Sequence, residues 1–352
     1  VIFLSMKEIQ SSNIDDCVEA VKILLESLFR EFRGILKELD EFDKAAFMKY
    51  AMKQISIEET KKGLKILCDI LFNYYKQQVI VLIDEYDAPL TYAFKTLYSN
   101  VLKTNSNLKM GVLTGAIRVA QAGIFSDLNN LKVNTILNKA YDEYFGLSQE
   151  EVENTLKYYN LEYQIEEVRS WYDGYKFGNA EVYNPWSILN YIDDKELKPY
   201  WINTSGNVLI KELLLLSDGT VFEELNNLVN EQEKTIYINE SASLGNDLDP
   251  NRLWELMLFS GYLTVKEKIS NEIYLVKIPN KEIQTFFKSL FAEIVFKENY
   301  NITSMKAALE SKDIRTIVRI LEKVVLNAMS FYDTSKKYEN PYQTLFAGFF
   351  ML

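Results

Sequence analysis

Two adjacent carboxylates, Asp84 and Glu85, directly follow an uninterrupted apolar run in the stretch QQVIVLIDEYDAPL at residues 77–90. In proteins that hydrolyse nucleoside triphosphates, the first carboxylate of such a pair holds Mg²⁺, usually through water, and the second polarises the attacking water. A buried strand suits this chemistry because it delivers both groups to the carboxyl edge of a parallel sheet, where ligands bind. Many buried strands also end in a purely structural acidic turn, so the pair alone leaves both interpretations open.

The next apolar stretch adds a hydroxyl and an arginine. KMGVLTG at 109–115 is typical of another buried strand and includes Thr114 at its tip, and Arg118 follows closely. A polar residue at a neighbouring strand tip can contact the water or the γ-phosphate, and an arginine can stabilise charge in the transition state. The structural alternative is that Thr114 caps the following helix and Arg118 is a solvated surface charge.

Apolar strands and amphipathic helices alternate around these residues. Apolar spacing of three and four residues predicts helices over 14–38, 41–54, 58–76 and 89–104, and strands are expected at 1–6, 79–83 and 109–115. Because parallel strands need long crossovers, this order predicts an α/β domain with a parallel sheet, typical of nucleotide-binding proteins.

The pattern changes after residue 146. Helices dominate to about residue 225, a strand is expected at 235–241, and a hairpin is expected over 261–280 with KISNE as its turn. Residues 281–330 are again helical in pattern. Helices followed by a hairpin favour a winged-helix-like α+β module.

The composition excludes several classes of protein. A net charge of −11 argues against a generally basic nucleic-acid surface, and the absence of histidine excludes histidine triads and histidine–zinc sites. The two cysteines, Cys17 and Cys68, lie in apolar helical patterns, so we expect no disulfide framework and a cytoplasmic location. No apolar run approaches the roughly 18 residues that span a bilayer, so no membrane partner is expected.

A phosphate-binding loop of the form G-x-x-x-x-G-K-S/T is absent from the sequence. The backbone amides and lysine of such a loop surround the phosphates. The chain opens at Val1 inside an apparent strand and stops inside an apolar helical pattern. We therefore expect a fragment cut at both ends, with the loop one strand and one helix upstream.

Dense aromatics occupy WYDGYKFG at 171–178 and YNPWS at 183–187. One interpretation is a platform for base stacking or a partner. The other, which we favour, is a packed aromatic corner that joins two domains and in which Gly174 and Gly178 supply the turns.

Together these motifs indicate similarity to a known protein family. It resembles the bacterial AAA-ATPase-like family, whose members commonly carry a PD-(D/E)XK-type nuclease domain at the carboxyl end. The matching stretches are VIVLIDEYDAPL, GVLTGAIRVAQAGIFSDLNNL, WYDGYKFGNAEVYNPWSILNYI, PYWINTSGN, LWELMLFSGYLTV, VKIPNKEI and MSFYDTSKKYENPYQTLFAGFF.

The resemblance implies three parts. Residues 1–146 would be an AAA-like P-loop ATPase core truncated at its amino end, and residues 147–330 a mainly helical, winged-helix-like region. Residues 331–352 would be the first helix of a truncated nuclease domain.

The resemblance also implies ATP and Mg²⁺ as cofactors, with Asp84 as the metal residue and Glu85, Thr114 and Arg118 as catalytic groups. The expected function is an ATP-dependent switch module that controls a downstream nuclease, through which the protein would reach nucleic acid. A homo-oligomer is compatible with this role.

Alone, these 352 residues are expected to be inactive as ATPase and as nuclease, because the phosphate loop and the nuclease's metal-binding strands have no counterpart. One rival is a non-catalytic interaction protein that keeps the ATPase fold, with a purely structural acidic turn. Another is a protein whose nuclease is the only activity and in which nucleotide merely drives assembly.

Overall fold

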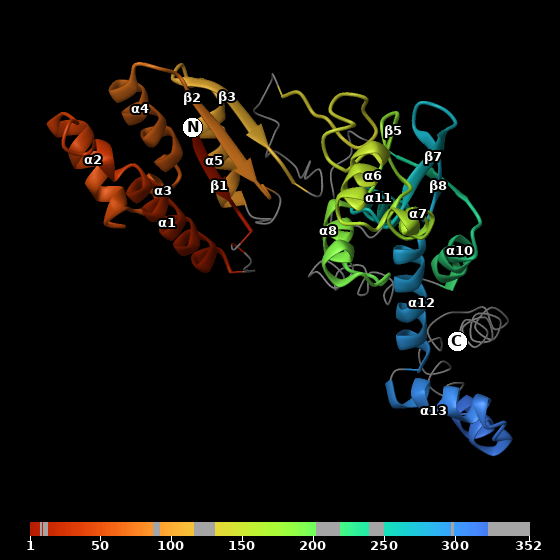
Figure 1. Cartoon of the computed structure of the whole chain (residues 1–352). Coiled ribbons are helices and arrows are strands. Elements are labelled where there is room, and N and C mark those ends of the chain that lie inside the picture. Colours follow the sequence, from red (N-terminus) through yellow and green to blue (C-terminus); the bar gives the residue numbers. More distant parts are fainter. Residues whose placement is uncertain are drawn as a thin grey trace. The chain divides into compact units, whose positions relative to one another are not determined.

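The apolar runs on either side of Asp84 form a three-stranded parallel sheet in the computed structural model of the chain (Figure 1). The structure describes residues 1–7, 9, 13–86, 92–115, 131–201, 219–238, 250–296 and 299–322. These residues divide into two compact units, one within Val1–Val133 and one from Asn134 onward. Within these ranges, no helix is long and apolar enough to cross a bilayer.

The sheet of the first unit has the strand order β1-β2-β3. The strands are β1 (Ile2–Ser5), β2 (Val79–Asp84) and β3 (Leu108–Leu113). Both pairings are parallel, with Phe3 opposite Leu82 and Leu82 opposite Val112. The central strand β2 is apolar up to its last residue, as expected for a strand inside a parallel sheet. The prediction of an α/β domain with a parallel sheet is confirmed for this unit.

Helical crossovers connect these strands. Their helices are α1 (Ile14–Glu31), α2 (Glu41–Ala51), α3 (Ile57–Thr60) and α4 (Gly63–Tyr75) between β1 and β2, and α5 (Tyr92–Leu102) between β2 and β3. One face of the sheet and the helices share a single core, which includes Ile2, Leu4, Val81, Ile83, Leu25, Leu28, Leu67, Leu71, Leu97 and Val101. Gly111 lets α5 lie close to β3, because a Cβ at this position would fall 2.4 Å from a methyl carbon of Leu102.

Some predicted helices differ from the observed ones in extent, and the helix expected over 41–54, for example, ends at Ala51. The helix expected over 14–38 ends at Glu31 and is followed by the 3-10 turn η1 (Arg33–Ile35), where Gly34 lowers helix propensity. The helix expected over 58–76 is divided into α3 and α4. Ser56 starts α3 with a capping box, since its hydroxyl accepts from the N–H of Glu59.

The second unit opens with helices and a small hairpin. These elements are α6 (Gln149–Tyr158), η2 (Glu162–Gln164), α7 (Ile165–Tyr172), β4 (Tyr175–Phe177), β5 (Ala180–Val182) and α8 (Pro185–Asp194). The antiparallel β4–β5 hairpin was not predicted, because three-residue strands are too short to show an alternating pattern. Its turn contains Gly178 at φ +53°, where a Cβ would lie 2.6 Å from the carbonyl oxygen of Asn138.

A second sheet follows, flanked by helices. The elements are α10 (Gly219–Val229), β6 (Lys234–Tyr237), α11 (Pro250–Phe259), β7 (Thr264–Lys268), β8 (Ile273–Lys277), α12 (Lys281–Phe296) and α13 (Asn299–Glu310). The strands are antiparallel in the order β6-β8-β7, so the predicted strand and hairpin are confirmed. Residues 331–352, the expected first nuclease helix, lie outside the described residues.

Gly174, two residues after the end of α7, offers a test of how closely this segment packs against Pro279. Its φ is +94°, and a Cβ there would fall 2.3 Å from the carbonyl oxygen of Pro279. We expect Gly174→Ala to lower the free energy of unfolding of the second unit by roughly 2–3 kcal/mol, from backbone strain and displacement. The tryptophans are Trp171, Trp186, Trp201 and Trp254, all in this unit. Urea denaturation followed by tryptophan fluorescence therefore reports on the second unit.

Gly261→Ala is the matched control for that substitution. Gly261 has a φ of +82°, but the nearest atoms to its notional Cβ are ring carbons at 3.5 Å or more. We expect this variant to lose only about 1 kcal/mol, from strain alone. Equal losses in the two variants would show that the contact with Pro279 is unimportant.

Candidate functional site

The carboxyl edge of the parallel sheet aligns polar side chains from all three strand ends. Ser5 lies opposite Asp84 in the register of β1 and β2. The hydroxyl of Thr114, the first residue after β3, donates a hydrogen bond to Asp84 Oδ1 at 2.5 Å. The structure thus brings Asp84 and Thr114, two of the predicted site residues, into direct contact.

Backbone hydrogen bonds hold this corner in place. The N–H of Thr114 donates to the carbonyl of Ile83 at 2.9 Å, and the N–H of Tyr86 donates to the carbonyl of Thr114 at 3.0 Å. The β2–β3 ladder therefore continues past the ends of both strands. This continuation fixes the position of Thr114 relative to Asp84.

Glu85 occupies a strained turn directly after β2. Its φ is +51°, and its N–H donates to Asp84 Oδ1 at 3.0 Å. Lys76 has a similar φ but ends α4, a common place for a left-handed residue. Glu85 instead ends a strand, and the next residue, Tyr86, is buried with its carbonyl accepting from the Tyr98 hydroxyl at 3.1 Å. Backbone strain of this kind clusters at functional sites.

The corner is accessible, and it is poor in metal ligands. Asp84 and Glu85 are half-buried, and Thr114 is exposed. In the part of the chain that the structure describes, no group of three histidine, cysteine or acidic side chains could hold a metal ion. A Mg²⁺ ion at Asp84 would therefore take most of its ligands from water and from phosphate oxygens, as Mg²⁺ commonly does.

Arg118, the predicted charge-stabilising group, lies outside the described residues.

Ser5 was not predicted as part of the site. It could have been found from the sequence, because it ends the first strand and the carboxyl ends of parallel strands meet at one edge.

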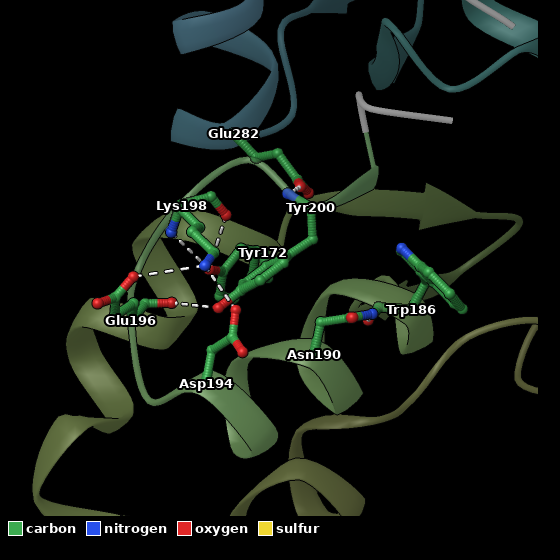
Figure 2. Close-up of polar contacts among 8 residues, drawn as sticks. All are labelled: Tyr172, Trp186, Asn190, Asp194, Glu196, Lys198, Tyr200 and Glu282. Carbon is green, nitrogen blue, oxygen red and sulfur yellow. Dashed lines mark hydrogen bonds and ion pairs between the residues drawn. The ribbon is translucent and has the colours of Figure 1, made fainter. Parts of the chain in front are cut away.

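The aromatic motifs of the second unit form a packed corner (Figure 2). The ring of Tyr172 lies 6.1 Å from that of Tyr191 and 6.2 Å from that of Tyr200, measured between centroids. The buried tyrosines of the two motifs are Tyr172, Tyr175 and Tyr183. Burial confirms the packed-corner part of the structural interpretation for these three, whereas Trp186 on α8 is 53% exposed. All four residues lie within the second unit.

A buried carboxylate holds this corner together. Glu282 is fully buried, and its Oε1 accepts from the backbone N–H groups of Tyr200 at 2.6 Å and Trp201 at 2.8 Å. Its Oε2 accepts from the Ser187 hydroxyl at 2.8 Å. Burial raises the pKa of Glu282, and these three donors oppose that effect only in part. The carboxylate therefore links α12 to α8 and to the segment that contains Tyr200.

Asn280 links the motifs VKIPNKEI and WYDGYKFG. Its side-chain oxygen accepts from the N–H of Ile283 at 3.2 Å, which caps α12, and its amide donates to the carbonyl of Asp173 at 2.8 Å. These motifs are far apart in sequence but form one structural junction. Both motifs therefore take part in the packing of the second unit.

Lys198 lies beside this corner and forms ion pairs with two acidic side chains (Figure 2). It pairs with Asp194 at 2.5 Å and with Glu196 at 3.4 Å, and all three side chains are substantially exposed. Exposed pairs of this kind contribute little to stability. We assign no chemistry to them.

The first unit is thus an α/β protein with a parallel sheet whose carboxyl edge carries an acidic strand end, consistent with a P-loop-like fold. Residues 1–125 match the family model described as Predicted AAA-ATPase. This match confirms the resemblance to the AAA-ATPase-like family for that part of the chain.

One curated protein is similar in sequence to part of this chain. The chain is 24% identical over 224 residues to "Uncharacterized protein in vnfD 5'region" of Azotobacter chroococcum mcd 1. The match takes in 59% of this chain and 42% of that relative, so it spans less than half of the relative's length. No solved structure matches the chain.

Glu282 can be tested by paired substitutions. Glu282→Ala leaves two buried N–H groups and one hydroxyl without their acceptor, so we expect a loss of about 3–5 kcal/mol in the free energy of unfolding of the second unit. Glu282→Gln keeps an amide oxygen as acceptor and should lose only about 1 kcal/mol. Urea denaturation followed by tryptophan fluorescence measures both. A Glu282→Ala variant as stable as Glu282→Gln would contradict this role.

The same residue makes stability depend on pH. Because the pKa of Glu282 is raised from its ordinary value of 4.5, the folded state binds this proton more readily than the unfolded state. Its contribution is therefore fully present below the unfolded pKa and is lost as pH rises through the folded pKa. We expect Glu282→Gln to flatten this part of the profile of urea midpoint against pH. Burial also raises the pKa of Asp173. Both proteins contain Asp173, so it does not cause the difference between their profiles. Identical slopes of the two profiles above pH 4.5 would refute the assignment.

Proposed function

We propose that the first unit is the hydrolysis half of an ATP-binding and ATP-hydrolysing switch module. The observation that carries this proposal is the Asp84–Thr114 hydrogen bond at the carboxyl edge of a parallel sheet. Asp84 would hold Mg²⁺ through water, and Glu85 would orient the attacking water. Thr114 would contact that water or the γ-phosphate, and Arg118 would stabilise the developing charge.

The described residues include groups suited to bind Mg²⁺ and the attacking water, but no loop that would bind the phosphates. The open Asp84–Thr114 corner offers oxygen atoms, which are the ligands that Mg²⁺ prefers. When bound, the ion would supply positive charge next to the phosphates. No stretch of the sequence has the form of a phosphate-binding loop. ATP would therefore need a loop from elsewhere, and the 352 residues alone should not hydrolyse it.

The second unit supports a winged-helix-like assignment for part of its length. Strand β6 lies between helices α10 and α11 in the chain, and the β7–β8 hairpin follows α11. The first strand, β6, pairs with the last strand, β8, so the hairpin and a strand between the helices form one small sheet. We propose that this module transmits the state of the ATPase to a downstream nuclease in a cytoplasmic, bacterial, homo-oligomeric protein.

The role of Glu85 is tested in the protein extended upstream along its gene. We expect the extended protein to bind and hydrolyse ATP with Mg²⁺. Glu85→Gln should retain ATP binding and lower turnover by about 10²-fold or more, because the amide cannot act as a base toward the attacking water. Binding is measured by calorimetry with ATP, and turnover by release of inorganic phosphate.

Glu41→Gln is the control, since Glu41 is exposed at the start of α2 and lies outside the proposed site. Its turnover should equal that of the unsubstituted protein. Unchanged turnover in Glu85→Gln would remove Glu85 from its proposed role. An extended protein that lacks the loop and binds no ATP would leave a non-catalytic scaffold as the function.

A further inference from the structure

The turn after β2 holds Glu85 in a conformation that its neighbours must enforce. Its φ of +51° lies in the left-handed region, which is unfavourable for a residue with a Cβ and persists only where the surrounding structure fixes it. The peptide group before Glu85 is hydrogen-bonded on both sides. The carbonyl of Asp84 accepts from the N–H of Met6 at 2.9 Å, and the N–H of Glu85 donates to Asp84 Oδ1 at 3.0 Å. The strand end therefore fixes one side of the turn.

The other side of the turn is fixed through Tyr86. Its N–H donates to the carbonyl of Thr114 at 3.0 Å, and its carbonyl accepts from the hydroxyl of Tyr98 at 3.1 Å. The first bond continues the sheet, whereas the second comes from helix α5. Because Glu85 lies between these two anchored segments, it can return to a negative φ only if one of the flanking peptide groups turns.

Tyr98 is fully buried and belongs to the core that α5 shares with the sheet. A phenylalanine would fill the same space, so what the hydroxyl adds is its hydrogen bond. A buried hydroxyl is costly unless it finds a partner, and here a backbone carbonyl next to the candidate site accepts from it. The hydroxyl therefore links α5 to the turn that contains Glu85.

We propose that Tyr98 is a positioning residue for Glu85. Its hydroxyl, through the carbonyl of Tyr86, keeps Glu85 in the left-handed conformation and so sets the direction in which the Glu85 carboxylate leaves the end of β2. The hold on the turn is a property of the described residues, whereas its effect on hydrolysis rests on the proposed function. Tyr98 acts on hydrolysis only through Glu85.

Amide hydrogen exchange tests the hold on the turn in the 352-residue chain, without ATP. In Tyr98→Phe, the amide of Tyr86 should exchange about tenfold faster, because the turn opens locally once its carbonyl loses this donor. Residue-resolved exchange followed by NMR measures the rate. Tyr50→Phe is the matched control, since Tyr50 is also buried in this unit and its hydroxyl donates to the carbonyl of Glu59 at 2.7 Å. Exchange at Tyr86 should be unchanged in that variant.

Turnover tests the positioning role in the protein extended upstream along its gene. Tyr98→Phe should lower turnover at saturating ATP by about tenfold and leave the dissociation constant of ATP unchanged, because Glu85 orients water and does not bind phosphate. Tyr50→Phe should change neither quantity. In the Glu85→Gln background, Tyr98→Phe should cause no further loss, since a residue that acts only through Glu85 has nothing left to position.

Unchanged exchange at Tyr86 in Tyr98→Phe overturns the proposal, whether or not the protein hydrolyses ATP. Faster exchange with unchanged turnover overturns the positioning role. A loss that persists in the Glu85→Gln background does so too, because Tyr98 would then act through another group. Unchanged turnover in Glu85→Gln would contradict the proposed function instead, and faster exchange at Tyr86 would still support the hold of Tyr98 on the turn.

Discussion

The pairing of β2 with a parallel strand on each side is the constraint on which the candidate site depends. The ladder with β3 places Thr114 beside Asp84 and continues through Tyr86 beyond the strand ends. The ladder with β1 places Ser5 on the other side. A slip of one residue in either register would turn these side chains to opposite faces, because the side-chain period of a strand is two. The polar corner therefore exists only in this register.

The second unit depends on a different kind of interaction. There a fully buried carboxylate, Glu282, takes donors from two separate segments and so orders an aromatic corner. Such a group is costly to bury unless its partners are all in place. The motifs around it are consequently interdependent. Three tyrosines of the stretches that suggest a stacking surface, Tyr172, Tyr175 and Tyr183, are accordingly buried.

The predictable parts of this protein are those with local causes. Asp84 and Glu85 could be identified because an apolar run and an acidic end are adjacent in sequence. The β7–β8 hairpin was predictable for a similar reason, since its strands and turn are contiguous. Glu282 was missed because its role arises from partners about 80 or more residues away. Ser5 was overlooked although its place at the end of the first strand puts it at the same edge of the sheet. The β4–β5 hairpin was missed because its strands are too short to carry a period.

The sequence by itself determined the alternation of strands and helices, and hence a parallel sheet with acidic groups at the end of its central strand. It could not determine which face of that sheet the helices cover. Side chains alternate between the two faces of a strand, and here both faces are apolar, so the pattern does not distinguish them. Tertiary structure decided this point by packing α1, α4 and α5 on one face. It thereby placed Asp84 and Thr114 at the end of the opposite face, which the described helices of this unit leave open.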